Sequence, residues 1–205
     1  DGVAPGVGCL PGWEDVEILV IDLFTGMDGG GHAFEAAPAS VQGKVAFVQF
    51  ETDPYCRSLL RDKAGPRTVL SDMPDASGLV GSVLALVEDD SYLRQILSWP
   101  GRLRHVPRPG GSPCQGLSSV GMGRGFDDPR SALVWVVPVI RDIVVSIVPV
   151  SVGHLLENVK SMDDADRDAI SRIMGSSPQV VDAAEVAACS RPRLFWNSMG
   201  HVSVE

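Results

Sequence analysis

Short, continuous apolar runs alternate along this chain with segments of helical periodicity. The first run, residues 16–24, is apolar at almost every position, and a second run covers residues 45–50. Runs of this kind are typical of strands buried on both faces, which occur in parallel sheets covered by helices on either side. The alternation therefore predicts an α/β fold with a mostly parallel sheet and helices on both faces.

Other segments continue the same alternation and complete the predicted element order. Further strands are expected at residues 68–70, 151–156, 179–183 and 193–197, with a weak candidate at 103–106 that Pro107 and Pro109 disfavour. Helices are expected at residues 32–37, 54–63, 79–87, 92–97, 131–147 (kinked at Pro138) and 164–174. Residues 1–15 are predicted to be an irregular lead-in, and residues 110–129 a long glycine-rich loop.

The charge balance limits how the chain could bind nucleic acid. The formal net charge is −9, which argues against binding by overall charge alone. Five arginines between residues 101 and 131 face only two aspartates, so this segment carries +3 and the remainder −12. The segment predicts a local basic rim on an acidic body, with ordinary solvated arginines as the alternative.

Cysteine usage and hydropathy bear on metal, compartment and membrane. None of the four cysteines forms a CxxC pair, so no zinc site and no other metal site is expected. Nothing resembles a signal peptide, which favours a reducing, intracellular setting. Residues 132–152 are apolar, but Arg141 and Asp142 lie at their centre, so we expect no membrane span.

Glycines and acids follow the first three predicted strands, where ligands of such sheets bind. The turn Asp22-Leu-Phe-Thr-Gly26-Met-Asp-Gly29-Gly30 would let a cofactor approach the backbone closely. Glu51 could accept hydrogen bonds from both ribose hydroxyls, and Asp72 one from an adenine amino group. Each feature alone also fits an ordinary turn or a surface acid.

Reactive side chains follow the later predicted strands. Cys114, in Gly110-Gly-Ser-Pro-Cys-Gln, is a candidate nucleophile. Glu157 ends a buried run and could act as a general acid if burial raises its pKa. Arg191 and Arg193 flank the start of another strand, where arginines also commonly act only as solvated caps.

In order and spacing, these motifs resemble those of the DNA (cytosine-5)-methyltransferases, over residues 17–199. The resemblance implies a Rossmann-like S-adenosylmethionine-dependent methyltransferase fold, and residues 166–196 are closest to the eukaryotic de novo class. It implies that S-adenosylmethionine is the methyl donor and S-adenosylhomocysteine the product. The positions that would bind this cofactor are Asp22, Phe24, Gly26, Gly29, Glu51 and Asp72.

The resemblance also implies a mechanism on a cytosine of DNA flipped out of its duplex. Cys114 would attack carbon 6, Glu157 would protonate or hydrogen-bond nitrogen 3, and Arg193 and Arg191 would hold the carbonyl oxygen. The glycine-rich loop at residues 116–126 would close behind the base.

Two departures from the family pattern qualify these expectations. The strand before Gly110 is normally apolar in the family, which puts the seating of Cys114 in question. The chain is expected to be a catalytic core, residues 16–205, that lacks the target-recognition region and the last motif. A partner subunit or a missing C-terminal segment would then complete it, and we expect weak binding to duplex DNA.

The sequence leaves two alternative functions and two cellular locations open. Transfer-RNA cytosine-5 methyltransferases share these motifs, and some relatives are non-catalytic regulatory subunits. The resemblance to the eukaryotic class implies the nucleus, with a bacterial cytoplasm as the alternative.

Overall fold

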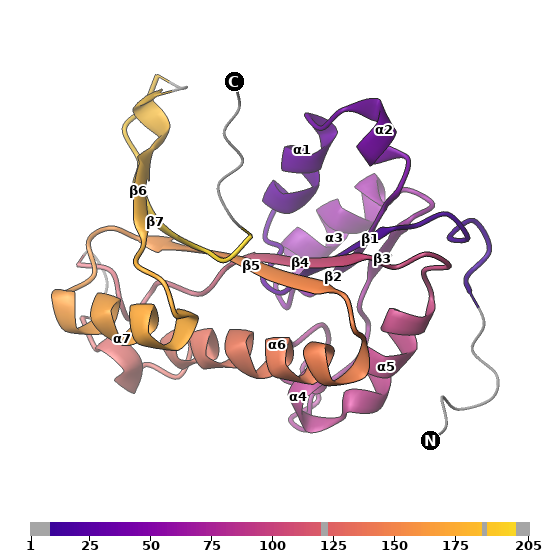
Figure 1. The fold of residues 1–205 in the computed structure, drawn as a ribbon. Helices are drawn as coiled ribbons and strands as arrows, with labels where there is room; N and C mark the ends of the chain where they lie inside the picture. The colour runs from indigo at the N-terminus through magenta and orange to yellow at the C-terminus, as the bar shows by residue number, and fades with distance from the viewer. Residues whose placement is uncertain (1–8, 120–122, 186–187, 200–205) are drawn as a thin grey trace.

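The computed structural model describes residues 9–119, 123–185 and 188–199, and it contains one seven-stranded sheet (Figure 1). The strand order is β3-β2-β1-β4-β5-β7-β6. The first five strands are parallel, and β7 pairs antiparallel with both β5 and β6. The strands are β1 (Ile18–Asp22), β2 (Val45–Gln49), β3 (Thr68–Leu70), β4 (His105–Gly111), β5 (Ser151–Val159), β6 (Gln179–Asp182) and β7 (Pro192–Asn197).

Helices cover both faces of this sheet, which confirms the predicted fold class. In Figure 1 the first three α-helices lie on one side of the sheet and the last four on the other. The first group is α1 (Gly29–Glu35), α2 (Ala39–Gln42) and α3 (Pro54–Lys63). The second group is α4 (Ala85–Glu88), α5 (Asp90–Ser98), α6 (Val136–Ile147) and α7 (Asp164–Met174). Three short 3-10 helices are η1 (Gly125–Asp127), η2 (Ser131–Trp135) and η3 (Ala183–Glu185).

Strand β4 differs most from its prediction, because it contains both prolines and extends to Gly111. Successive N–H groups along a strand point to alternate neighbours, so Pro107 and Pro109 both lack a donor toward the same strand. That strand is β1, since Leu23 N donates to Pro109 O at 3.3 Å. β4 forms a single register pair with β1 but pairs with β5 over its whole length. Both prolines are tolerated in the middle of the sheet because they weaken the same side of β4.

Two helix predictions were also wrong in part. Residues 79–84 form no helix, because Gly81 has φ +77° and lies so close to Glu51 that a Cβ would be 2.2 Å from its carbonyl oxygen. The predicted helix 131–147 is divided into η2 and α6. Pro138 lies in the first turn of α6, where its missing N–H would have no helical partner.

The core extends across the sheet and includes part of the predicted lead-in. Trp13 is 2% exposed and packs edge-on against Trp99, with ring centroids 5.8 Å apart. Burial of an aromatic side chain of this size contributes about 2 kcal/mol or more. None of the described helices combines the length and the apolar character that a membrane span requires.

Candidate active site

The carboxyl ends of β1 and β2 are joined by one carboxylate. Glu51 Oε2 accepts a hydrogen bond from Gly26 N at 2.8 Å, and its Oε1 accepts from the N–H groups of Thr52 and Asp53, both at 2.8 Å. Gly26 has φ +57°, which an L side chain rarely adopts. Glu51 therefore fixes the turn that follows β1, and its Oε2 keeps a lone pair for a ligand.

Asp22 lies inside this turn as a buried acid with acidic neighbours. Its side chain is 3% exposed. Burial, and to a lesser degree the negative charges of Asp28 and Glu51, raise its pKa to about 7. A ligand that brings positive charge to this edge would relieve the repulsion and favour the ionised carboxylate.

The glycines after β1 have different roles. A Cβ at Gly26 or Gly29 would meet nothing within 4 Å, so open space adjoins the backbone at both positions. A Cβ at Gly30 would lie 2.7 Å from Asp22 Oδ2 and 3.4 Å from Pro109 Cγ. Close approaches that a side chain would disturb are therefore at Gly30, which the sequence motif contained but did not single out, and at Gly31, where a Cβ would lie 2.4 Å from Asp28 Oδ1.

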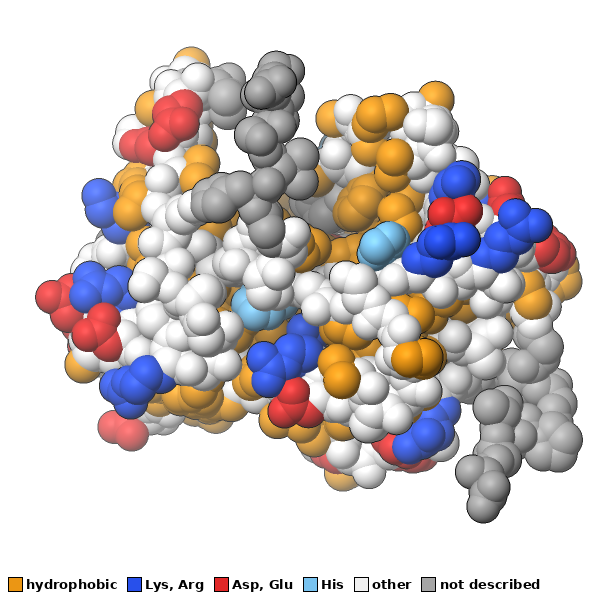
Figure 2. Space-filling model, viewed as in Figure 1, with side chains coloured by type: hydrophobic (Ala, Val, Ile, Leu, Met, Phe, Trp, Pro, Cys, Tyr) orange, Lys and Arg blue, Asp and Glu red, His pale blue; other side chains and the backbone are white. Residues whose placement is uncertain are grey.

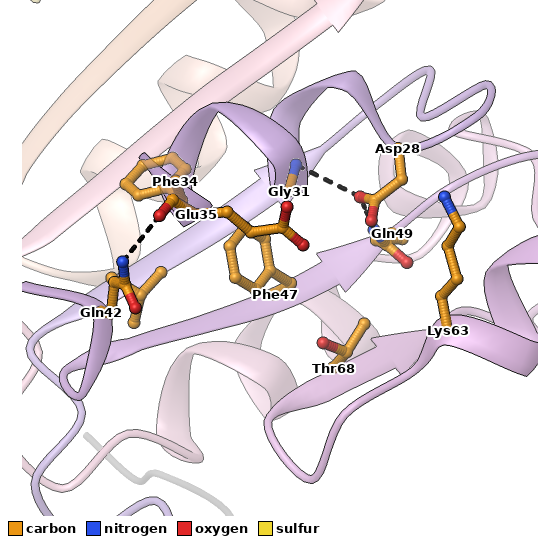
Figure 3. A pocket seen from close by; sticks show the side chains of 10 residues that line it. Asp28, Gly31, Phe34, Glu35, Gln42, Phe47, Gln49, Lys63 and Thr68 are labelled. Atoms are coloured by element: carbon orange, nitrogen blue, oxygen red, sulfur yellow. Dashed lines mark hydrogen bonds between the residues drawn. The ribbon is translucent and has the colours of Figure 1, made fainter. Parts of the chain in front are cut away.

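A pocket of about 190 Å³ opens beside this turn, between α1, α2 and the strands β2 and β3 (Figure 3). Gln49 and Asp28 line one end, joined by a hydrogen bond of 2.7 Å from Gln49 Nε2 to Asp28 Oδ1. Asp28 adopts φ 74° and also caps α1, accepting from Gly31 N at 3.2 Å. These contacts show that Asp28 and Gln49 support the turn, which the sequence reading missed.

The remaining cofactor candidates are Phe24 and Asp72. Phe24 Cδ2 would lie 3.2 Å from a Cβ at Gly110, so the ring packs closely over the end of β4. The Asp72 carboxylate forms ion pairs with Arg57 and, at 3.2 Å, with Arg61. Both ion pairs are formed by Oδ1, so an adenine amino group could donate to Oδ2.

Glu157 and Arg193 form an ion pair across neighbouring strands. Arg193 Nε lies 2.7 Å from Glu157 Oε1, and both side chains are partly exposed. Glu157 pairs with Phe195, so Arg193, two residues away on β7, projects to the same face. A Cβ at Gly111 would lie 2.7 Å from Glu157 Oε2, so a larger residue there would displace the end of the Glu157 side chain. The structure thus brings these two predicted site residues into contact, and their roles stay a prediction.

Cys114 follows β4 in a loop held by a buried amide. Asn158 is 1% exposed, and its Nδ2 donates to Ser112 Oγ at 2.9 Å and to Ser112 O at 3.2 Å. The carbonyl oxygen of Cys114 accepts from the N–H groups of Leu117 and Ser118. Asn158 thus links the strand that carries Glu157 to the loop that carries Cys114. Its place beside Glu157 in the motif was the signal that could have identified this role.

The two arginines of the Arg-x-Arg segment have different surroundings. The backbone N–H of Arg191 donates to Asp182 Oδ1 at 2.7 Å, while its side chain is exposed. Of the two arginines, only Arg193 forms an ion pair with Glu157. Part of the loop expected to close over the base, residues 120–122, lies outside the described residues.

The predicted basic rim is reduced by the fold. Arg108 is buried, Arg130 pairs with Asp128 at 2.7 Å, and Arg104 lies 3.7 Å from Glu17. Figure 2 shows acidic and basic side chains interspersed over the face that it presents. Among the described residues, no group of three His, Cys, Asp or Glu side chains is arranged to hold a metal ion.

Comparisons with known proteins agree with this geometry. Residues 109–177, which include Cys114, Glu157 and Asn158, match the model of the C-5 cytosine-specific DNA methylase family. The type II methyltransferase M.AquIA of Picosynechococcus sp. is 28% identical over 174 residues, which cover 82% of this chain and 60% of that protein.

The fold has a structural counterpart as well. The structure of a methyltransferase from Entamoeba histolytica superposes with a TM-score of 0.57 at 15% identity, over 92% of this chain and 55% of that one. The chain therefore spans little more than half the length of these two proteins. It contains a stretch that matches the C-5 cytosine-specific DNA methylases, set in a fold that it shares with a methyltransferase.

Proposed function

We propose that this chain transfers a methyl group from S-adenosylmethionine to carbon 5 of a cytosine in DNA. The observation that carries the proposal is the Glu157–Arg193 ion pair near the carboxyl end of β5. Asn158 and Ser112 link this ion pair to the loop of Cys114. The match over residues 109–177 and the relative M.AquIA support the same reaction class.

The cofactor end of the site fits the proposed methyl donor. Open space adjoins Gly26 and Gly29, and Glu51 Oε2 has a remaining lone pair beside it. The buried acid Asp22 suits a cationic ligand, and the bound cofactor would supply an electrophilic methyl group. Phe24 and Asp72 would complete the contacts as the family resemblance implies.

The residues of this chain account for activation of a poor nucleophile. The Cys114 thiolate would add to carbon 6 of the flipped base, which breaks the aromaticity of the ring and makes carbon 5 nucleophilic. In its protonated form Glu157 would donate a hydrogen bond or a proton to nitrogen 3, where negative charge develops. Arg193 orients Glu157 and could reach the neighbouring carbonyl oxygen, with Arg191 as the outer arginine. After methyl transfer, a base removes the proton from carbon 5 and the sulfur leaves.

We also propose that the substrate is DNA, that the chain belongs to the eukaryotic de novo class, and that the protein is located in the nucleus. A further segment or a partner subunit would supply target recognition and complete the cofactor pocket. Because the chain has net charge −9 and its basic rim is reduced, we expect weak duplex binding without that addition.

Covalent trapping tests the proposed reaction. The chain is incubated with S-adenosylmethionine and duplex DNA that contains 5-fluorocytosine, whose fluorine prevents the last proton loss. We expect a covalent adduct with the unmodified chain and none with Cys114→Ser, while Cys56→Ser serves as the matched control. An adduct that persists in Cys114→Ser would refute the assignment, and RNA of the same sequence distinguishes the transfer-RNA alternative.

A further inference from the structure

Arg108 is a buried cation that the proposed reaction does not use. It lies in the middle of β4, is 1% exposed, and donates from Nη1 to the carbonyl oxygen of Val137 in α6 at 2.7 Å. Its Nε and Nη2 are also buried and have no hydrogen-bond partner among the described residues. These two nitrogens form one edge of the guanidinium, the edge that binds carboxylates with two parallel hydrogen bonds.

A second buried polar side chain, His154, lies on the neighbouring strand. It is the register partner of Arg108 on the neighbouring parallel strand, so both side chains project to the same face of the sheet. The backbone N–H of His154 donates to Ser198 Oγ at 2.9 Å, and that hydroxyl lies 3.0 Å from His154 Nδ1. In the tautomer in which the Ser198 hydroxyl donates to Nδ1, the ring proton is on Nε2. That Nε2 is also buried without a partner among the described residues.

Among the described residues, no acidic side chain forms an ion pair or hydrogen bond with these donors. Burial lowers the pKa of Arg108 to about 10 and that of His154 to about 4, and the positive charge of Arg141 adds to both effects. The neighbouring acid Asp142 is mostly exposed and forms its ion pair with Arg141 at 2.8 Å. A buried guanidinium with two unsatisfied donors is costly, so a missing acceptor is expected.

We propose that Arg108 and His154 form a binding site for a small carboxylate, on the face of the sheet opposite Glu157 and Arg193. The two guanidinium donors Nε and Nη2 and their positive charge match an anion that has two oxygens at a fixed separation, and the Nε2–H tautomer of His154 would add a third donor. The site is on the strand that leads into the Cys114 loop, because β4 carries Arg108 and ends at Gly111, three residues before Cys114. The carboxylate is either a free small anion or the side chain of an aspartate or glutamate from a polypeptide segment.

Formate binding to the unmodified chain tests this site directly. The Arg108 Nε–H resonance of ¹⁵N-labelled protein is followed by NMR while sodium formate is added, with sodium chloride at equal ionic strength as the reference. We expect a saturable shift with formate that chloride does not produce, together with a rise in the thermal unfolding midpoint. Titration with N-acetyl-aspartate amide distinguishes the sources, because only a site open to side chains would also bind it.

Two substitutions complete the test. Arg108→Met is expected to weaken formate binding by about tenfold or more, whereas Arg102→Met, at an exposed arginine of the same segment, is expected to leave it unchanged. If Arg108→Met does not fold, the titration of the unmodified chain decides alone. No saturable shift, or an equal shift with chloride, would show that the unpaired donors do not bind a carboxylate. These outcomes do not depend on methyl transfer.

Discussion

The contact between Asn158 and Ser112 offers the sharpest test of how this site is built. Asn158→Ala removes two hydrogen bonds to Ser112, of 2.9 Å and 3.2 Å, and the local one that Asn158 Oδ1 accepts from Val159 N at 2.8 Å; the side chain is 1% exposed. It also leaves the Ser112 oxygens buried, since that residue is 3% exposed. Two bonds at about 1 kcal/mol each, plus the penalty for an unsatisfied buried acceptor, give a loss of about 3 kcal/mol in the free energy of unfolding.

A double-mutant cycle isolates the contact from the cavity. Ser112→Ala removes only the 2.9 Å bond and should cost about 1 kcal/mol. Urea unfolding of the two single variants and the double variant should then give a coupling energy of about 1 kcal/mol. Additivity of the two single effects to within about 0.3 kcal/mol would refute the claim that this hydrogen bond holds the loop.

The same variants test whether the contact positions the nucleophile. A displacement of Cys114 by about 1 Å is expected to lower the trapping rate with 5-fluorocytosine DNA by roughly 100-fold. Val144→Ala, at a fully buried position on α6, provides a variant that is also destabilised but lies away from the loop. Equal trapping rates in Asn158→Ala and Val144→Ala would contradict a positioning role for Asn158.

Three further predictions concern the acids and glycines of the site. The pKa of Asp22 is raised to about 7 in the folded chain, so the free energy of unfolding should fall as pH rises from about 4 to 7, by roughly 4 kcal/mol at most. In urea unfolding measured across that range, Asp22→Asn should remove this dependence on pH. Gly30→Ala should lower the free energy of unfolding by about 1–3 kcal/mol because the new Cβ would meet Asp22, whereas Gly29→Ala should be neutral or stabilising. A smaller loss at Gly30 than at Gly29 in thermal unfolding would show that the close approach is not at Gly30. Glu157→Gln should slow adduct formation by about 100-fold or more while leaving the fold intact by circular dichroism; an unchanged rate would exclude Glu157 as the proton donor.

The sequence by itself determined the elements whose signals are local. Apolar runs predicted the buried strands β1 and β2 closely, because a strand covered on both faces needs apolar residues at nearly every position. The bounds of α3 and α7 were predicted correctly, since Asp53 caps one helix and Gly175, with φ 68°, ends the other. The order of acids, cysteine and arginines likewise indicated one edge of the sheet.

Tertiary structure alone decided the features that depend on neighbours. Pro107 and Pro109 weakened the prediction of β4, yet both face β1 while pairing with β5 continues, which no local pattern reveals. Residues 79–84 are kept from forming a helix by the packing of Gly81 against the backbone of Glu51. Arg108 and His154, which are 46 positions apart in the sequence, likewise lie on neighbouring strands only because β4 and β5 pair in this register. Sequence patterns report the local conformation that a residue prefers. Strand register and burial decide which polar groups lie together and need hydrogen-bond partners.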